Sequence, residues 1–238
     1  KKKEEEKKQP QRKDVKSKTQ PTKPEPKAKP QPKQAKAEED TGPAISAEDA
    51  ENAVACIIPN ETLEKLKASP WKDRQAGLLE LLEWISENSQ QVSENSEAMF
   101  RFVRSVTNDW KENNFNVIKA AIGVLSSICE NCNVTKRGGA MALTAQALEK
   151  LGDPKIVEPL SALLMSLCEV LGPRFVVAMT VKNTSECKKP KAVSECCNVV
   201  NKIISEFGVH TVNLPDVVNY SKACLNQANP TIKKSAQA

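Results

Sequence analysis

The residue types that perform most protein chemistry are sparse in this chain of 238 residues. It contains one histidine, His210, and eight cysteines. Cys129 and Cys132 form a Cys-x-x-Cys pair, but no second pair stands at zinc-finger spacing and no βαβ pattern surrounds it. His210 follows Gly208, a residue type that commonly ends helices, so we predict a surface turn and not a catalytic base. We therefore expect neither a metal site nor histidine-based catalysis.

Two further patterns could belong to an enzyme, and neither has the required spacing. The stretch 136–139 (KRGG) lacks the Lys-Ser/Thr pair of a phosphate-binding loop, which favours an isolated helix start. Glu80 and Glu83 lie three residues apart on one predicted helix, which indicates a solvated face and not a catalytic pair. We therefore predict that the chain is not an enzyme and uses no cofactor.

Charge is distributed unevenly along the chain. The whole sequence has 35 basic and 30 acidic residues, whereas residues 1–40 alone hold 14 basic and 8 acidic side chains. The remainder is therefore close to neutral, which argues against a nucleic-acid-binding domain with basic residues clustered on one face. No apolar run approaches the ~20 residues needed to cross a bilayer. We expect neither nucleic acid nor a membrane as partner.

Residues 1–43 predict a disordered linker rich in lysine and proline. They contain seven prolines and one large apolar residue, Val15. Such a segment buries too little apolar surface to offset its ordering entropy. It is either a solvated spacer or a tether attracted to a polyanionic surface. The folded domain is expected to span residues 44–238.

The start of the chain and the positions of its cysteines indicate what kind of polypeptide it comes from and in which compartment. The chain starts without Met and shows no signal-peptide pattern, so we expect a piece of a longer polypeptide. Four cysteines lie within apolar helical patterns, as free buried thiols do in a reducing cytoplasm. They are Cys129, Cys168, Cys196 and Cys197.

From Ser46 onward the sequence has helical periodicity. Ser46 is expected to cap a helix that stops at Pro59, and Asp153 to cap another that has Pro154 at its first position. Period-two alternation is not evident, so we predict an all-α fold. Apolar stripes at helical spacing recur in residues 78–85, 99–106, 115–129, 160–171 and 193–207.

The helix starts recur about every 40 residues, which predicts a repeat protein. The second helix of each pair is expected to begin near Trp71, Asn113, Pro154, Pro190 and Pro230. A period near 40 with two helices per unit is typical of HEAT-type repeats, which stack into an α-solenoid. The turns inside the units then lie along one edge, and we expect function on that edge or on the concave face.

Those turns share a composition that favours protein binding. Each contains Lys or Arg beside turn-forming residues, and the first two also contain a tryptophan, Trp71 or Trp110. Trp and Arg are enriched at binding hot spots. Alternatively, both indoles pack locally over their repeats and the lysines are merely solvated. The turns are residues 69–74, 108–114, 152–155, 182–191 and 226–233.

The segment SPWKDRQAGLLELLEWI resembles the opening repeat of a TOG domain, in which a Trp-Lys-x-Arg turn enters the second helix. The resemblance covers roughly residues 46–238, and the second turn is most similar to that of an internal member of the multi-TOG microtubule polymerases, with the third domain as one candidate. It continues in family order through DWKENNFNVIKAAIGVLSSICENC, LEKLGDPKIVEPLSALLMSLCE, VKN, AVSECCNVVNKIISEFG and NQANPTIKKSA.

The resemblance implies a paddle-shaped, monomeric module that binds the αβ-tubulin heterodimer through its turns, at microtubules, the spindle or the centrosome. Because tubulin is acidic, lysines that face it would give complementary steering. The implied β-tubulin contacts are Trp71, Lys72, Arg74, Trp110, Lys111, Asn114 and Lys155. The implied α-tubulin contacts are Lys182, Asn183, Asn229 and Lys233.

The sequence departs from the family pattern in its later turns. The fourth turn has Thr184 where the family has proline, and a Ser-Glu-Cys-Lys-Lys stretch lengthens it before Pro190. The chain ends at Ala238, inside the helix after the fifth turn, whereas the family has a further repeat. We therefore expect a domain truncated at its C-terminus. The alternative function is a HEAT-repeat scaffold for a different protein partner.

Overall fold

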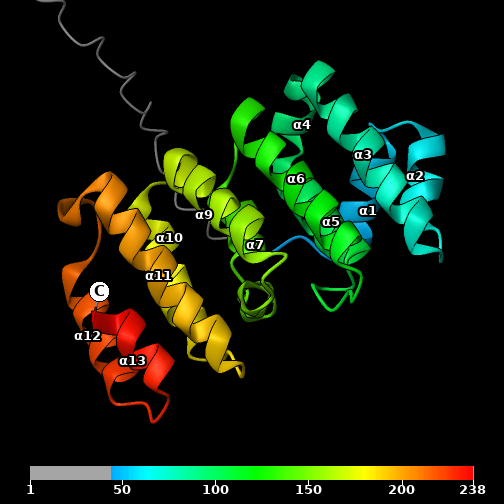
Figure 1. Cartoon of the computed structure of the whole chain (residues 1–238). Helices are drawn as coiled ribbons and strands as arrows, with labels where there is room; N and C mark the ends of the chain where they lie inside the picture. Colours follow the sequence, from blue (N-terminus) through cyan, green and yellow to red (C-terminus); the bar gives the residue numbers. More distant parts are fainter. Residues whose placement is uncertain (1–43, 238) are drawn as a thin grey trace, which may run out of the picture. The chain divides into compact units, whose positions relative to one another are not determined.

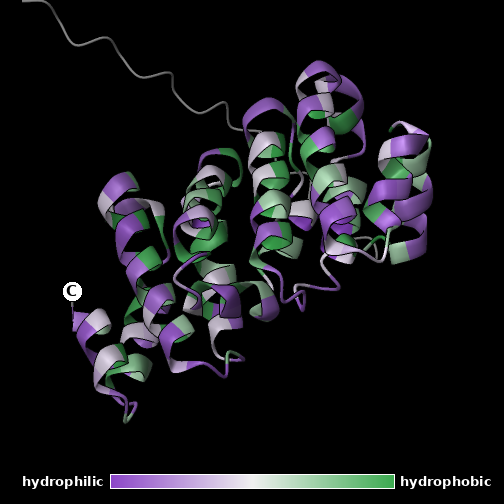
Figure 2. Cartoon of the chain, turned by 45° about the vertical axis from the view of Figure 1, so that its right-hand side comes forward, coloured by the Kyte–Doolittle hydropathy of each residue, from purple (hydrophilic) through white to green (hydrophobic). Residues whose placement is uncertain are grey.

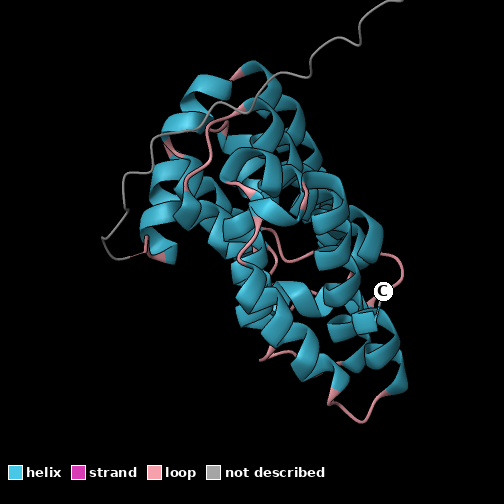
Figure 3. Cartoon of the chain, turned by 90° about the vertical axis from the view of Figure 1, so that its left-hand side faces the viewer, coloured by secondary structure: helices cyan, strands magenta, loops and turns pink. Residues whose placement is uncertain are grey.

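The computed structural model describes residues 44–237, and the regular structure in this range is entirely helical (Figures 1 and 3). The predicted all-α fold is confirmed, whereas the expected linker at residues 1–43 lies outside the described residues. None of the helices in this range is long and apolar enough to cross a membrane.

The described helices follow one another with short connections. They are α1 (Ala47–Ala55), α2 (Asn60–Lys67), α3 (Trp71–Glu87), α4 (Ser89–Glu94), α5 (Ser96–Val106), α6 (Phe115–Asn131), α7 (Lys136–Ala142), α8 (Ala145–Leu148), η1 (Glu149–Gly152), α9 (Val157–Leu171), α10 (Pro173–Thr184), α11 (Pro190–Phe207), η2 (Val209–Thr211), α12 (Leu214–Leu225) and α13 (Pro230–Gln237).

The helices of residues 44–237 stack in two layers. In one layer α3, α6, α9, α11 and α13 each pack on the next. In the other layer α1 packs on α5, α5 on α7, and α10 on both α8 and α12. Short turns connect the layers within each pair, as between α5 and α6 (Figure 1). This arrangement is the predicted α-solenoid of helical hairpins.

The second helices begin close to the predicted positions. They start at Trp71, Phe115, Val157, Pro190 and Pro230, so the period near 40 is confirmed. The third of these helices begins three residues later than expected. The Asp153 carboxylate accepts the Lys155 backbone N–H at 2.9 Å and so closes a tight turn before the helix instead of capping it.

The first helix begins as predicted and ends earlier. The Ser46 hydroxyl accepts the Asp49 backbone N–H at 3.0 Å, as an N-cap does. Helix α1 ends at Ala55, before the predicted stop at Pro59. Because proline disfavours helical geometry in the residue before it, a helix ends before the proline itself.

One continuous apolar core runs through the stack. Leu78, Leu81 and Ile85 of α3 are fully buried, as the helical stripe predicts. The core extends in sequence from Ala50 to Val217. A separate small cluster lies between α11, α12 and α13, and its buried members are Val193, Cys197, Cys224 and Ile232.

Most of the cysteines are buried, whereas Cys132 and Cys187 are half-buried and Cys56 is exposed. The four that were expected inside helical stripes are all buried, and the structure records every cysteine as free. Burial raises the pKa of the Cys129 thiol to about 12, so it stays protonated and is a poor metal ligand. Among the described residues, no group of three or more His, Cys, Asp or Glu could hold a metal ion.

The two carboxylates on α3 differ from each other. Glu83 is exposed as predicted, but Glu80 is not simply solvated. It accepts the Lys65 ammonium at 2.6 Å and the Thr62 hydroxyl at 3.3 Å, so it joins α3 to α2. The prediction for Glu80 was wrong because sequence spacing along α3 carries no information about the facing helix.

Candidate protein-binding edge

The turns that connect the two layers lie along one edge of the stack, where the loops are mostly hydrophilic (Figure 2). We call this the turn edge and define it as residues 68–70, 107–114, 153–156, 185–189 and 226–229. Every residue that the resemblance assigns to tubulin lies in this edge or within four residues of it in the sequence. Side chains near these turns connect each of the first three turns to the next.

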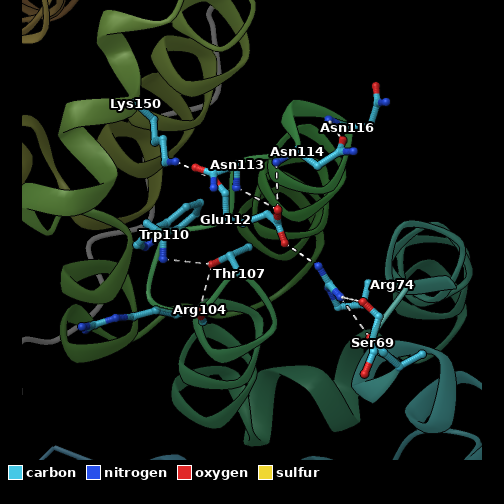
Figure 4. Close-up of polar contacts among 11 residues, drawn as sticks. Ser69, Arg74, Arg104, Thr107, Trp110, Glu112, Asn113, Asn114, Asn116 and Lys150 are labelled. Atoms are coloured by element: carbon cyan, nitrogen blue, oxygen red, sulfur yellow. Dashed lines mark hydrogen bonds and ion pairs between the residues drawn. The ribbon is translucent and has the colours of Figure 1, made fainter. Parts of the chain in front are cut away.

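Arg74 connects the first turn to the second (Figure 4). Its guanidinium donates to the carbonyls of Ala68 and Ser69 and forms an ion pair with Glu112. Only 18% of the Arg74 side chain and 15% of the Glu112 side chain are exposed. Arg74 therefore holds the turns together and offers little surface to a partner.

Glu112 is the centre of this network. Its carboxylate accepts the backbone N–H groups of Asn113 and Asn114 at 2.7 and 2.8 Å, in addition to the Arg74 ion pair. Burial alone would raise the pKa of Glu112, but the hydrogen bonds from Asn114, Arg74 and Asn113 lower it below its usual value. The ionised carboxylate therefore stabilises the second turn.

Lys150 continues the network to the third repeat. Its ammonium donates to the Glu112 carbonyl at 2.6 Å (Figure 4). Burial, and next the nearby charge of Lys189, lower the pKa of Lys150. Sequence reasoning missed Glu112 and Lys150, although both lie within the motifs that carry the family resemblance. A charged residue beside a turn gives no sign in the sequence of which distant turn it will reach.

The second turn has unusual backbone geometry. Asn108, Asp109 and Trp110 have φ angles of 49°, 53° and 65°. This left-handed region is uncommon for residues other than glycine. Asp109 N–H donates to the Arg104 carbonyl at 2.9 Å, and Glu112 N–H donates to the Thr107 carbonyl at 3.0 Å. These bonds on either side hold the turn in its conformation.

The expectation that Trp110 contacts tubulin conflicts with its position. Its side chain is 1% exposed, and its indole N–H donates to the Met141 carbonyl at 3.3 Å. The consecutive left-handed residues direct the indole inward, against α7. Trp110 is therefore packed inside the domain, as the local-packing alternative describes, and a partner cannot reach it in this structure.

Four residues of the predicted β-tubulin side are exposed on or beside the turn edge. Trp71 is 37% exposed at the first position of α3, and the Lys72 ammonium lies 5.8 Å from its ring centroid. Lys111 is exposed in the second turn, and Lys155 in the third. The Lys155 ammonium lies 4.0 Å from the centroid of the Phe115 ring, a cation–π contact that orients it.

The asparagines assigned to the edge make hydrogen bonds within the domain. Asn114 caps α6 by accepting the Asn116 N–H at 2.9 Å, and Asn229 accepts the Thr231 N–H at 2.9 Å at the start of α13. The Asn183 amide donates to the Leu143 carbonyl. All three are half-buried, so their main effect is to shape the turns.

The fourth turn is attached to the third repeat. The Lys188 backbone N–H donates to the Glu149 carboxylate at 2.8 Å, and the Cys187 thiol lies 3.6 Å from the Ala145 carbonyl. Lys182 and Lys233, from the predicted α-tubulin side, are exposed on α10 and α13. The inserted residues of this turn are therefore packed on the neighbouring repeat.

A stack of helical hairpins with a polar, cation-rich edge defines a helical-repeat protein of the HEAT type. The sequence profile described as "XMAP215/Dis1/CLASP, TOG domain" matches residues 61–238 of this chain. The chain belongs to this TOG-domain family.

Individual relatives agree with this assignment. Centrosomal protein 224 of Dictyostelium discoideum is 30% identical over 189 residues, which cover 76% of this chain and 9% of that protein. Protein mini spindles of Drosophila melanogaster is 29% identical over 192 residues, which cover 81% and 9%. The chain thus spans about a tenth of the length of the curated relatives that it matches.

A solved structure supports the likeness to an internal domain. Drosophila melanogaster Mini spindles TOG3 matches with a TM-score of 0.70 and 29% sequence identity, over 76% of this chain and 78% of that chain. The sequence-based likeness to an internal TOG domain is therefore consistent with the structural match.

Proposed function

We propose that this domain is a non-catalytic module that binds the αβ-tubulin heterodimer through its turn edge. The observation that carries the proposal is the half-exposed indole of Trp71, held at a helix start beside cations. A tryptophan in such a position is a typical hot-spot anchor. Family membership supplies the partner, because the motifs that resemble TOG domains include this turn.

The contacts between turns support a preformed binding edge. The Arg74–Glu112 pair and the Lys150 hydrogen bond fix the first three turns relative to one another. A partner therefore meets Trp71 and its neighbouring lysines in set positions and loses little conformational entropy on binding. Arg74 and Asn114 act in the proposal as positioning residues, and Trp110 as part of the core.

The exposed cations define the second element of the proposal. Lys72, Lys111 and Lys155 would face β-tubulin, and Lys182 and Lys233 would face α-tubulin. Facing an acidic protein, such lysines raise the association rate more than they raise affinity. Within a longer protein the domain would act on microtubules in the cytoplasm, at spindles or centrosomes, and polymerase activity would require several such domains.

The test is size-exclusion chromatography of the domain with purified αβ-tubulin. We expect the unmodified chain to co-elute with tubulin and Trp71→Ala to lose at least about tenfold in affinity, as removal of a hot spot does. Leu79→Ala is the matched control, because Leu79 is 47% exposed on the same helix and lies away from the turn. Equal co-elution of Trp71→Ala and Leu79→Ala would refute the anchor.

A charge-reversal pair tests the cations separately. Lys155→Glu should slow association several-fold at low salt, because like charges then face each other. Lys119→Glu is the control, because Lys119 is exposed within α6 and lies outside the turn edge. The scaffold alternative would be supported by two results together. The unmodified domain would bind no tubulin, and it would bind another protein equally well with or without Trp71→Ala or Lys155→Glu.

A further inference from the structure

Two cysteines meet in the small cluster between α11, α12 and α13, near the C-terminal end of the stack (Figure 1). The Cys197 Sγ of α11 lies 3.5 Å from the Cys224 Sγ of α12. The two side chains are only 3% and 1% exposed. Thiols that are 27 positions apart in the sequence are therefore in direct contact inside the domain, away from the proposed tubulin contacts.

The distance between the two sulfurs is short enough for a bond to form with little movement. A disulfide joins sulfurs about 2.05 Å apart, so the pair has to close from 3.5 Å by about 1.5 Å. Within α12 the buried side chains are Val217 and Cys224. A small shift of this helix toward α11 therefore disturbs little of the core.

Cys197 is the more reactive thiol of the pair. Its Sγ also lies 3.4 Å from the Tyr220 hydroxyl oxygen. The hydrogen bond with Cys224 lowers the pKa of Cys197, burial opposes this effect, and the hydrogen bond with Tyr220 adds to it, so the pKa falls below that of a free thiol. The same contact raises the pKa of Cys224. Cys197 is therefore the nucleophile, and Cys224 keeps its proton.

The cysteines of the continuous core lack this activation. Burial raises the pKa of both members of the Cys-x-x-Cys pair, Cys129 and Cys132. It also raises the pKa of Cys168. Because the thiolate is the form that reacts with oxidants, these three thiols should react slowly and provide an internal comparison.

We propose that Cys197 and Cys224 form an oxidation site, at which hydrogen peroxide converts the two thiols into a disulfide that joins α11 to α12. The Cys197 thiolate attacks one peroxide oxygen, so that an S–O bond forms, the O–O bond breaks and hydroxide leaves. The Cys224 sulfur then attacks the Cys197 sulfur, the S–O bond breaks, and the departing hydroxide takes the Cys224 proton. The proton that Cys197 had released converts the first hydroxide into water, so two thiols and one peroxide give one disulfide and two waters.

Local opening gives the peroxide access to the pair. The cluster that holds both cysteines has only two other buried members, Val193 and Ile232, and Ile232 belongs to α13. Elements with few buried apolar contacts open at low free energy, and hydrogen peroxide is little larger than water. Once formed, the disulfide would tie α12 to α11 two residues before the fifth turn begins at Asn226.

The test is treatment of the full chain with hydrogen peroxide, followed by peptide mapping without reduction. We expect a disulfide between Cys197 and Cys224 that dithiothreitol reverses. It should form at least about tenfold faster than Cys129 and Cys168 are oxidised, because those thiols stay protonated.

Two variants separate the steps of the reaction. Cys224→Ala should stop the reaction at the sulfenic acid of Cys197, which a dimedone probe labels. Cys56→Ser is the matched control, because Cys56 is exposed and its loss should leave the disulfide unchanged. The mapping itself uses the unmodified chain, so it remains informative even if Cys224→Ala unfolds.

Hydrogen exchange measures the consequence for the fold. In the oxidised chain the amides of α12 should exchange at least about tenfold more slowly, because the covalent link suppresses local opening of this helix. The amides of α3 and α6 should be unaffected. Dithiothreitol should restore the original rates in α12.

Three results would overturn the proposal. One is a chain in which Cys129 and Cys168 are oxidised as fast as Cys197. Another is a disulfide between Cys187 and Cys196 in place of the one between Cys197 and Cys224. The third is unchanged exchange of α12 in the fully oxidised chain, because the bond would then not hold α12 in place. None of these measurements involves tubulin, so failure here leaves the proposed tubulin binding untouched.

Discussion

The two ends of the stack are held together by different chemistry. At the first three turns, Arg74, Glu112 and Lys150 form charged hydrogen bonds that cross from one repeat to the next. At the last repeat, α13 is held by neutral contacts. The Ser194 and Ser235 hydroxyls lie 2.7 Å apart, and the Asn201 amide donates to the Ser235 carbonyl at 3.0 Å.

The two ends of the stack also differ in how many apolar side chains they bury. The first repeats belong to the continuous core, which includes large side chains such as Trp110 and Phe100. The cluster beneath α13 contains four buried residues, of which two are cysteines. Elements with few buried apolar contacts open locally at lower free energy than the core does. We infer that the first turns form a rigid edge and that α13 opens before the rest of the domain.

The largest effect is expected from Trp110→Ala. Removal of a fully buried tryptophan should lower the free energy of unfolding by about 3–5 kcal/mol, since it leaves a cavity in the core. Urea denaturation followed by circular dichroism measures this loss. Trp71→Ala is the comparison and should change stability by less than about 0.5 kcal/mol. Similar losses of stability for the two variants would contradict the assignment of Trp110 to the core and of Trp71 to the surface.

Glu112→Gln should have an intermediate effect. Loss of the charge weakens the bonds from Arg74 and two backbone N–H groups, so we expect a loss of about 1.5–3 kcal/mol at neutral pH. Because the folded pKa of Glu112 is lowered, its contribution is present above the unfolded value of about 4.3 and is lost as pH falls through the folded pKa.

The pH dependence provides the check for this variant. The stability difference between the unmodified chain and Glu112→Gln should shrink as pH falls below about 4.3. Glu83→Gln is the control, because Glu83 is exposed on α3 and lies outside the network of Arg74, Glu112 and Lys150. If the difference in the free energy of unfolding stays constant down to low pH, the hydrogen bonds and ion pair of Glu112 do not lower its pKa in the folded chain.

Ile232→Ala tests the other end of the comparison. Ile232 is 1% exposed within the small cluster, so its truncation should remove the hydrogen-exchange protection of α13. Protection in α3 and α6 should stay the same, and the main unfolding transition should move by less than about 1 kcal/mol, because α13 opens independently. A loss of protection throughout the stack would show that α13 and the core unfold together.

The smallest effect is expected at the exposed cations. Lys155→Ala removes one cation–π contact, and Lys72→Ala removes a longer one, so each should change the free energy of unfolding by less than about 0.5 kcal/mol. Thermal unfolding measures both changes. A clear destabilisation by either variant would place that lysine among the groups that hold the turns together.

Much of this architecture could be predicted from sequence because it depends on local patterns. The stripe from Leu78 to Ile85 identifies a buried helix face whatever lies opposite it. The helix starts every 40 residues or so identify a repeat stack. Boundaries were less certain, as at Asp153, because a tight turn and a helix cap use the same side-chain hydrogen bond.

The candidate site was predicted less completely. Trp71 and Trp110 both stand beside lysine in a turn, and the sequence does not distinguish them. The structure places Trp71 on the surface and Trp110 in the core. The difference arises because three consecutive residues with left-handed backbone geometry direct the Trp110 side chain inward. Likewise Arg74 was assigned to a partner, whereas the structure pairs it with Glu112.

By itself the sequence determined the helical class, the repeat period and the set of turns that face one edge. These follow from periodicity, capping and proline positions, which act over a few residues. Only the tertiary structure decided which charged side chains form contacts within the domain and which remain exposed on its surface. That division depends on contacts between residues 38 positions apart, such as Arg74 with Glu112 and Glu112 with Lys150. Such contacts form only when neighbouring repeats stack.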